Sequence, residues 1–150
     1  MTATIKAEKN KKRESTLKKI TLALIIAKPG HLRNGLQSLL RSIPQIEILA
    51  ESYDPSVLLK MNEEIRPELI LVDGAMFDEA NWSSLTKIKV DWPRTKILVL
   101  TENDQQGQTA KEAGADFCLL KGFPATELAH LIEISLTHDA HDENNLSTKD

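Results

Sequence analysis

The sequence has few of the residues that build cross-linked or membrane-spanning proteins. One cysteine among 150 residues excludes a disulfide scaffold, and aromatic residues make up only 4% of the chain. No apolar run approaches the roughly 20 residues needed to cross a bilayer, and the first residues are charged where a signal segment would be apolar. These features predict a soluble, cytoplasmic protein that does not engage a membrane.

Motifs for enzyme chemistry are also missing. The sequence has no glycine-rich phosphate loop, no Ser/His/Asp arrangement and no cluster of metal-ligating residues. We therefore expect neither an enzyme with its own substrate nor a bound cofactor.

The charge that is present is unevenly distributed. The net charge is −3, but residues 1–20 hold seven Lys/Arg and two Glu, a net +5, so the other 130 residues carry −8. We expect a basic, flexible arm over residues 1–19, one domain over 20–137, and a disordered acidic tail over 138–150, whose sequence HDAHDENNLSTKD has no apolar period. A domain of this size can bury a full core without cross-links.

Short apolar runs alternate with amphipathic stretches between the arm and the tail. Five runs have the length of strands, and continuous apolar runs favour a parallel sheet covered on both faces: Thr21 to Ile26, Ile46 to Ala50, Leu69 to Val72, Ile97 to Leu100 and Phe117 to Leu120. Four apolar stripes between and after them have helical spacing: Leu32 to Ile43; Val57, Leu58, Met61 and Ile65; Trp82 to Ile88; Leu128 to Leu136.

The alternation extends to a fifth, weaker helix. Residues Asp104 to Ala113 have only alanines as apolar residues and contain Gly107, which predicts a short, loosely held helix. Two helix starts are marked by proline, at Asp54-Pro55 and at Pro124. Five strands alternating with five helices predict a doubly wound α/β sandwich.

The functional crevice of such a sheet lies beyond the carboxyl ends of its strands. The residues that follow the first, third, fourth and fifth apolar runs are Ala27-Lys28, Asp73, Thr101 and Lys121. One carboxylate, one hydroxyl and two ammonium groups are therefore expected at one edge of the sheet.

The same segments resemble a known family, the receiver domain of two-component response regulators. The likeness lies in four phrases that occur in the family's order and at its intervals: HLRNGLQSLLRSIPQIEILAES, RPELILVDGAM, TKILVLTEND and AGADFCLLKGFPATEL. The resemblance covers about residues 20–137. It implies a flavodoxin-like fold with strand order 2-1-3-4-5.

The resemblance also implies roles for individual residues. Asp73 matches the aspartate that accepts a phosphoryl group from a histidine kinase, while Thr101 and Lys121 match the residues that contact the phosphoryl oxygens. The family's acidic pair, which helps to hold Mg²⁺, falls on Ala27 and Lys28. Because Mg²⁺ prefers oxygen ligands and a lysine repels it, we expect weak or absent metal binding.

A further departure concerns the family's switch. Receivers usually carry an aromatic residue three positions before the lysine, and here that position is Cys118, which cannot act as an aromatic switch. We expect Cys118 to be a buried, inert thiol.

The substitution at position 28 has two interpretations. Lys28 and Lys121 could bracket Asp73 in an internal ion-pair cluster that takes the place of the metal. Alternatively, Lys28 points into solvent, since lysines are rarely buried unless paired.

Three functions remain open at this point. The favoured one is a stand-alone atypical receiver that acts as a signalling and protein-interaction module, independent of Mg²⁺-dependent phosphorylation, with another protein or a second copy as its partner. The second is a single-domain response regulator phosphorylated on Asp73. The third is a regulator that binds nucleic acid through the basic arm, which is disfavoured because the arm lacks interleaved aromatics and no helix-turn-helix follows.

Overall fold

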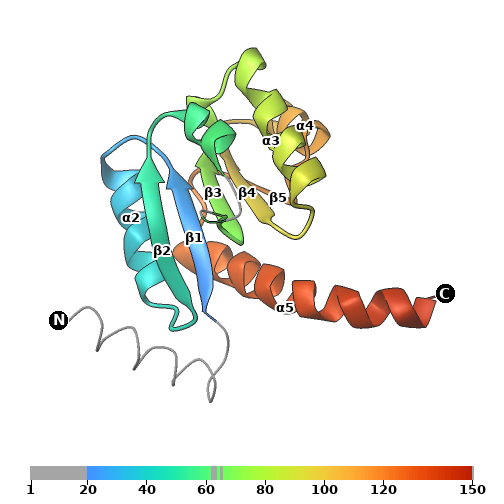
Figure 1. The fold of residues 1–150 in the computed structure, drawn as a ribbon. Helices are drawn as coiled ribbons and strands as arrows, with labels where there is room; N and C mark the ends of the chain where they lie inside the picture. The colour runs from blue at the N-terminus through green and yellow to red at the C-terminus, as the bar shows by residue number, and fades with distance from the viewer. Residues whose placement is uncertain (1–19, 62–63, 65, 150) are drawn as a thin grey trace.

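A central parallel sheet with helices on both faces forms the body of the molecule (Figure 1). The computed structural model describes residues 20–61, 64 and 66–149. The strands pair in the order β2-β1-β3-β4-β5, which confirms the expected α/β fold. Their bounds are β1 (Thr21–Ile26), β2 (Ile46–Ser52), β3 (Leu69–Asp73), β4 (Lys96–Thr101) and β5 (Phe117–Leu120).

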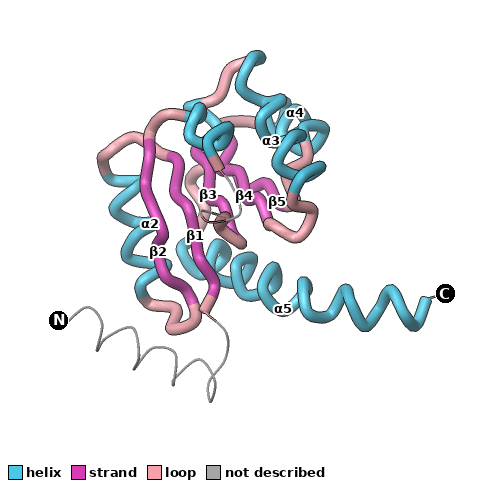
Figure 2. Tube along the Cα trace, in the orientation of Figure 1, coloured by secondary structure: helices cyan, strands magenta, loops and turns pink. Residues whose placement is uncertain are grey.

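The helices lie between and after the strands (Figure 2). The described part of the chain has four α-helices and two short 3₁₀ helices: α2 (His31–Arg41), η1 (Pro55–Lys60), η2 (Gly74–Met76), α3 (Glu79–Asp91), α4 (Asp104–Ala113) and α5 (Ala125–Lys149). The short helix expected over Asp104 to Ala113 is present as α4. Its first turn is capped by the Asn103 side chain, and it ends at Gly114, which adopts a left-handed conformation with φ 117°.

The connection from β2 to β3 differs from the expected α-helix. The predicted cap is present, because the Asp54 side chain accepts a hydrogen bond from the Ser56 amide, but the helix that follows is the 3₁₀ helix η1 and ends at Lys60. In a 3₁₀ helix, residues three apart share a face, so η1 buries Pro55 and Leu58 on one side. Ile65, the last residue of the expected stripe, lies outside the described residues.

The C-terminal helix is longer than expected. α5 continues to Lys149 and so includes residues 138–149, for which we expect a disordered tail. No glycine or proline interrupts residues 125–149, so the local sequence does not end the helix at residue 137. The basic arm over residues 1–19 lies outside the described part of the chain, and the division of the chain into arm, domain and tail remains a prediction.

Two apolar clusters hold the layers together. Alternate strand residues face opposite sides, so Ala23 and Ile25 pack with α2 and α5, whereas Leu24 and Ile26 pack with η1, α3 and α4. β3 is buried along its whole length because both clusters cover it. Within the described residues, no helix combines the length and apolar character needed to span a bilayer.

Candidate functional site

The carboxyl ends of the central strands bring the expected polar residues to one edge. The strand register aligns Ile26 with Val72 and Asp73 with Leu100, so Ala27, Asp73 and Thr101 leave the sheet at nearly the same level. Lys121 follows β5 and reaches back across this edge, where its Nζ lies 2.6 Å from Asp73 Oδ1. Asp73 and Lys121 therefore form an ion pair.

Asp73 is held by the backbone that follows it. Its Oδ1 accepts a hydrogen bond of 3.0 Å from the Ala75 amide, which caps η2, and only 8% of the residue is exposed. A Cβ atom on the next residue, Gly74, would lie 2.5 Å from Gln106 Oε1 and 2.9 Å from the Leu100 carbonyl oxygen. Position 74 therefore needs a glycine because the β4–α4 segment covers it.

Lys121 has a second carboxylate partner that the sequence analysis did not single out. Its Nζ lies 2.5 Å from Glu102 Oε1 as well as 2.6 Å from Asp73 Oδ1. Partial burial alone would lower the pKa of Lys121, yet the hydrogen bonds to the two carboxylates outweigh burial and raise the pKa above its ordinary value. Lys121 is thus held charged between Asp73 and Glu102.

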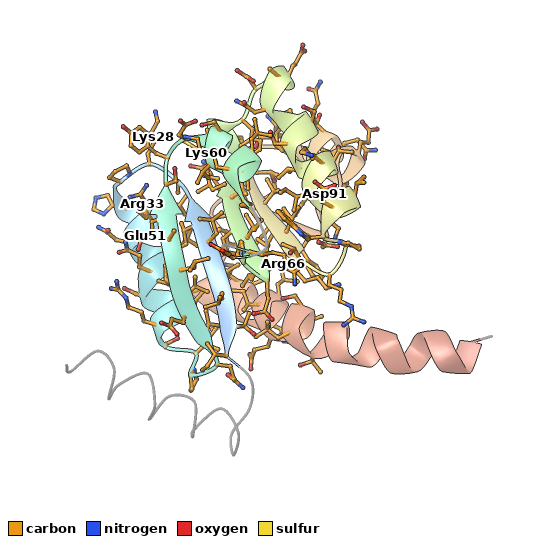
Figure 3. All side chains as sticks on the ribbon, viewed as in Figure 1. Lys28, Arg33, Glu51, Lys60, Arg66 and Asp91 are labelled. Atoms are coloured by element: carbon orange, nitrogen blue, oxygen red, sulfur yellow. The ribbon has the colours of Figure 1, made fainter. Side chains whose placement is uncertain are left out.

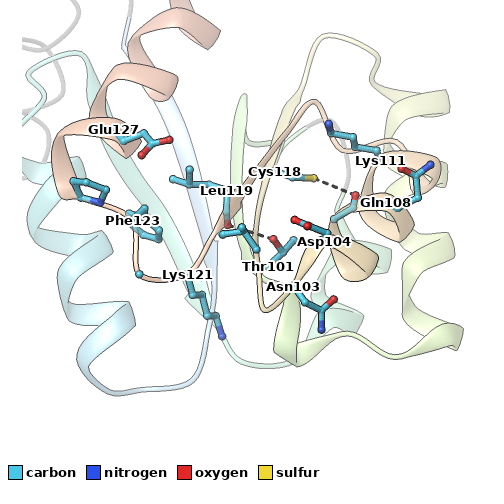
Figure 4. Close-up of a pocket in the computed structure, with 14 residues that line it drawn as sticks. Thr101, Asn103, Asp104, Gln108, Lys111, Cys118, Leu119, Lys121, Phe123 and Glu127 are labelled. Carbon is cyan, nitrogen blue, oxygen red and sulfur yellow. Dashed lines mark hydrogen bonds between the residues drawn. The ribbon is translucent and has the colours of Figure 1, made fainter.

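Thr101 is buried at the same edge but turns toward β5. Its hydroxyl donates a hydrogen bond of 3.5 Å to the Leu119 carbonyl oxygen, shown as a dashed line in Figure 4. Among the described residues it makes no hydrogen bond to Asp73.

Lys28 is exposed, so of the two interpretations the one in which Lys28 and Lys121 bracket Asp73 is wrong. The Lys28 side chain points outward from the loop after β1 (Figure 3) and forms no ion pair within residues 20–61, 64 and 66–149. The neighbouring Ala27 is fully buried, so the side of the loop that faces the sheet is occupied by a methyl group. An unpaired ammonium is more stable in water than in the crevice, which agrees with the solvent-facing interpretation.

A different cation stabilises the loop after β1. Arg33 on α2 donates hydrogen bonds of 2.8 Å from Nε and 2.5 Å from Nη2 to the Ala27 carbonyl oxygen. Arg33 also lies 3.9 Å from Glu51 on β2, and Gln37 donates to the same carboxylate (Figure 3). The sequence shows no clear signal for this role, because Arg33 occupies an ordinary polar position of an amphipathic helix.

The residues at this edge do not fit a Mg²⁺ ion. Ala27 supplies no oxygen from its side chain, Lys28 is exposed and has no side-chain oxygen, and Asp73 Oδ1 is already engaged by an ammonium and an amide. Among the described residues there is no group of three or more His, Cys, Asp or Glu that could hold a metal ion.

The family of the chain is identified by its similarity to known proteins. The model of the response regulator receiver domain matches residues 23–133. The chain belongs to this family. The receiver spans about half the length of the curated relatives it matches: it is 32% identical over 103 residues to the response regulator protein VraR of Staphylococcus aureus, covering 67% of this chain and 49% of VraR.

Solved structures share the fold of this receiver. The receiver domain of the putative response regulator NarL from Mycobacterium tuberculosis matches with a TM-score of 0.65 and 18% identity, over 78% of this chain and 97% of that one. A structure of two RcsB dimers bound to two parallel DNAs matches with a TM-score of 0.66 and 16% identity, over 79% of this chain and 62% of that one. At these identities the likeness concerns the fold.

A hollow of about 570 Å³ lies beside the ion-pair site of the receiver, between α4, β5 and the start of α5 (Figure 4). Cys118 lies in it at the position where an aromatic residue is usual, and its Sγ is 3.6 Å from the Gly107 carbonyl oxygen. Burial raises the pKa of the Cys118 thiol, and the nearby Lys111 opposes this only in part.

We expect Cys118 to react slowly with alkylating reagents. A raised pKa leaves less thiolate at neutral pH, and the thiolate is the reacting species, so iodoacetamide should label the folded protein at least about tenfold more slowly than the urea-unfolded protein. Intact-mass measurements over time would follow the labelling. Equal rates in the two states would contradict the expectation.

Proposed function

We propose that this receiver is an atypical signalling and protein-interaction module whose state does not depend on Mg²⁺-assisted phosphorylation of Asp73. The observation that carries the proposal is the surroundings of Asp73. The β1 edge next to it supplies Ala27 and Lys28 where the family places acidic residues. Phosphoryl transfer relies on a metal to neutralise developing charge, so a site without the acidic residues that hold the metal transfers slowly.

The proposed partner is another protein or a second copy of the chain. The RcsB structure holds dimers, and receivers act through their surfaces, which makes a second copy a reasonable partner to test. The proposed role requires no bound cofactor and no enzymatic activity.

A conventional phosphorylated receiver is the second candidate. Asp73, Thr101 and Lys121 meet at one edge, and the ion pair between Lys121 and Asp73 is in place. Asp73 would then accept the phosphoryl group despite the lost acidic pair.

Intact-mass spectrometry separates these two candidates. The protein is incubated with acetyl phosphate and Mg²⁺, and we expect no adduct of about 80 Da on the wild-type chain. An adduct that disappears in Asp73→Asn would overturn the proposal and establish the second candidate. A receiver with an intact acidic pair, treated in parallel, shows that the reagent is active.

Nucleic-acid binding through residues 1–19 is a third candidate, raised by the RcsB–DNA structure and by the net positive charge of that segment. Deleting residues 1–18 should abolish any DNA affinity and its salt dependence if the arm is the binding element.

A further inference from the structure

Glu102 occupies an unusual place in the site, because it shares the ammonium group of Lys121 with Asp73. The two carboxylate oxygens lie 2.5 Å and 2.6 Å from the same Nζ, so one positive charge faces two negative charges. Glu102 itself is exposed, whereas Asp73 is buried. The contact joins the start of the β4–α4 connection to the loop after β5.

The backbone of Glu102 is tied to α4. Its amide donates a hydrogen bond of 2.9 Å to Gln106 Oε1, and Gln106 Nε2 donates one of 3.4 Å to the Gly74 carbonyl oxygen, next to Asp73. The amide of Gln106 in turn donates to Asn103, the cap of α4. The first turn of α4 is therefore connected both to the residue that holds Lys121 and to the loop that carries Asp73.

We infer that Glu102 is a positioning residue: its carboxylate holds Lys121 beside Asp73, and its backbone amide couples this ion pair to the first turn of α4. This inference rests on the proposed function and deepens it, since it names a carboxylate of the chain itself as the group that sets the site without a phosphoryl group. Residues of α4 also form one wall of the hollow that contains Cys118.

The geometry distinguishes Glu102 from other nearby acids. Glu127 also lines the hollow, yet in Figure 4 the side chain of Lys121 extends away from it, and the two form no ion pair in the described part of the chain. Glu127→Gln therefore removes the same charge from the same surface without touching the pair. It is a matched control for Glu102→Gln.

The test measures the pKa of Lys121 by NMR titration of its side chain, with no phosphodonor and no metal present. Loss of one of two carboxylate partners should lower the pKa of Lys121 in Glu102→Gln, and the control Glu127→Gln should leave it unchanged. If Glu102 only stabilised the fold, the pKa of Lys121 would stay the same in a folded Glu102→Gln variant. Circular dichroism checks that the variant is folded.

Amide hydrogen exchange supplies the second readout. The amides of the first turn of α4 should exchange about three- to tenfold faster in Glu102→Gln than in wild type and in Glu127→Gln. An unchanged Lys121 pKa, or an unchanged exchange rate in α4, would overturn the inference. Neither result depends on acetyl phosphate, so an adduct on Asp73 would defeat the proposed function separately.

Discussion

Mg²⁺ is expected to leave thermal unfolding of the wild-type receiver unchanged and to stabilise the double variant Ala27→Asp/Lys28→Asp. The variant places acidic residues at positions 27 and 28, where the family has its acidic pair, and the alignment of Ile26 with Val72 brings position 27 level with Asp73. Without metal the three negative charges repel one another, and Mg²⁺ relieves this by supplying the positive charge they need. A Mg²⁺ concentration ten times the dissociation constant would add about 1.4 kcal/mol. The melting temperature of a domain of this size would then rise by about 5 °C.

The variant Lys28→Ala is the control for this prediction. It removes the cation from position 28 without adding a carboxylate, and the side chain it removes is exposed and forms no ion pair among the described residues. We expect its melting temperature to be insensitive to Mg²⁺. A Mg²⁺-dependent rise in the wild-type protein would show that the receiver binds the metal without the acidic pair, against the proposed function.

Replacing Lys89 by methionine is expected to cost about 2 kcal/mol of unfolding free energy. Lys89 Nζ lies 3.1 Å from both carboxylate oxygens of Asp116 and donates to the carbonyl oxygens of Pro93 and Thr95, each at 2.9 Å. Methionine would keep the apolar stem but leave Asp116 and two carbonyl groups without this donor. The side chains of Lys89 and Asp116 are 20% and 22% exposed, so the loss should be smaller than for a fully buried pair.

Lys87 provides a matched comparison two residues earlier on α3. It pairs with Asp91 at 3.0 Å, but the two side chains are 61% and 41% exposed. Solvent screens such a pair, so Lys87→Met should change the unfolding free energy by less than about 0.5 kcal/mol. Urea unfolding of both variants gives the comparison, and similar losses would show that the Lys89 network contributes no more than a surface ion pair.

Much of the fold could be predicted from the local sequence. Apolar runs such as Leu69 to Val72 are buried on both faces, and only a central parallel strand requires that pattern along its whole length. Asp54-Pro55 correctly marked a helix start, because the side-chain cap and the proline both act on the first turn of the helix that follows them. The type of that helix could not be predicted, because a 3₁₀ and an α-helix begin alike and tertiary packing decides between them.

The candidate site was predictable only in part, because tertiary packing decides some of its contacts. Residues that end neighbouring parallel strands must meet at one edge, so Asp73, Thr101 and Lys121 were found from their positions. Glu102 and Arg33 were missed because neither follows a pattern. Glu102 acts through a contact with Lys121, which is distant in sequence, and Arg33 acts through a backbone carbonyl. Neighbours in sequence do not encode the direction in which such a side chain points.

The sequence by itself determined the strand pattern, the likeness to the receiver family and the presence of Ala27 and Lys28 after the first strand, because each of these depends on which residues occupy which positions. Only the tertiary structure decided which contacts the residues around Asp73 make. In that structure Lys28 is exposed to solvent, Arg33 donates hydrogen bonds to the Ala27 carbonyl oxygen, and Glu102 forms an ion pair with Lys121. The physical reason is that a long charged side chain can reach several partners, and the packing of the surrounding helices and loops selects one of them.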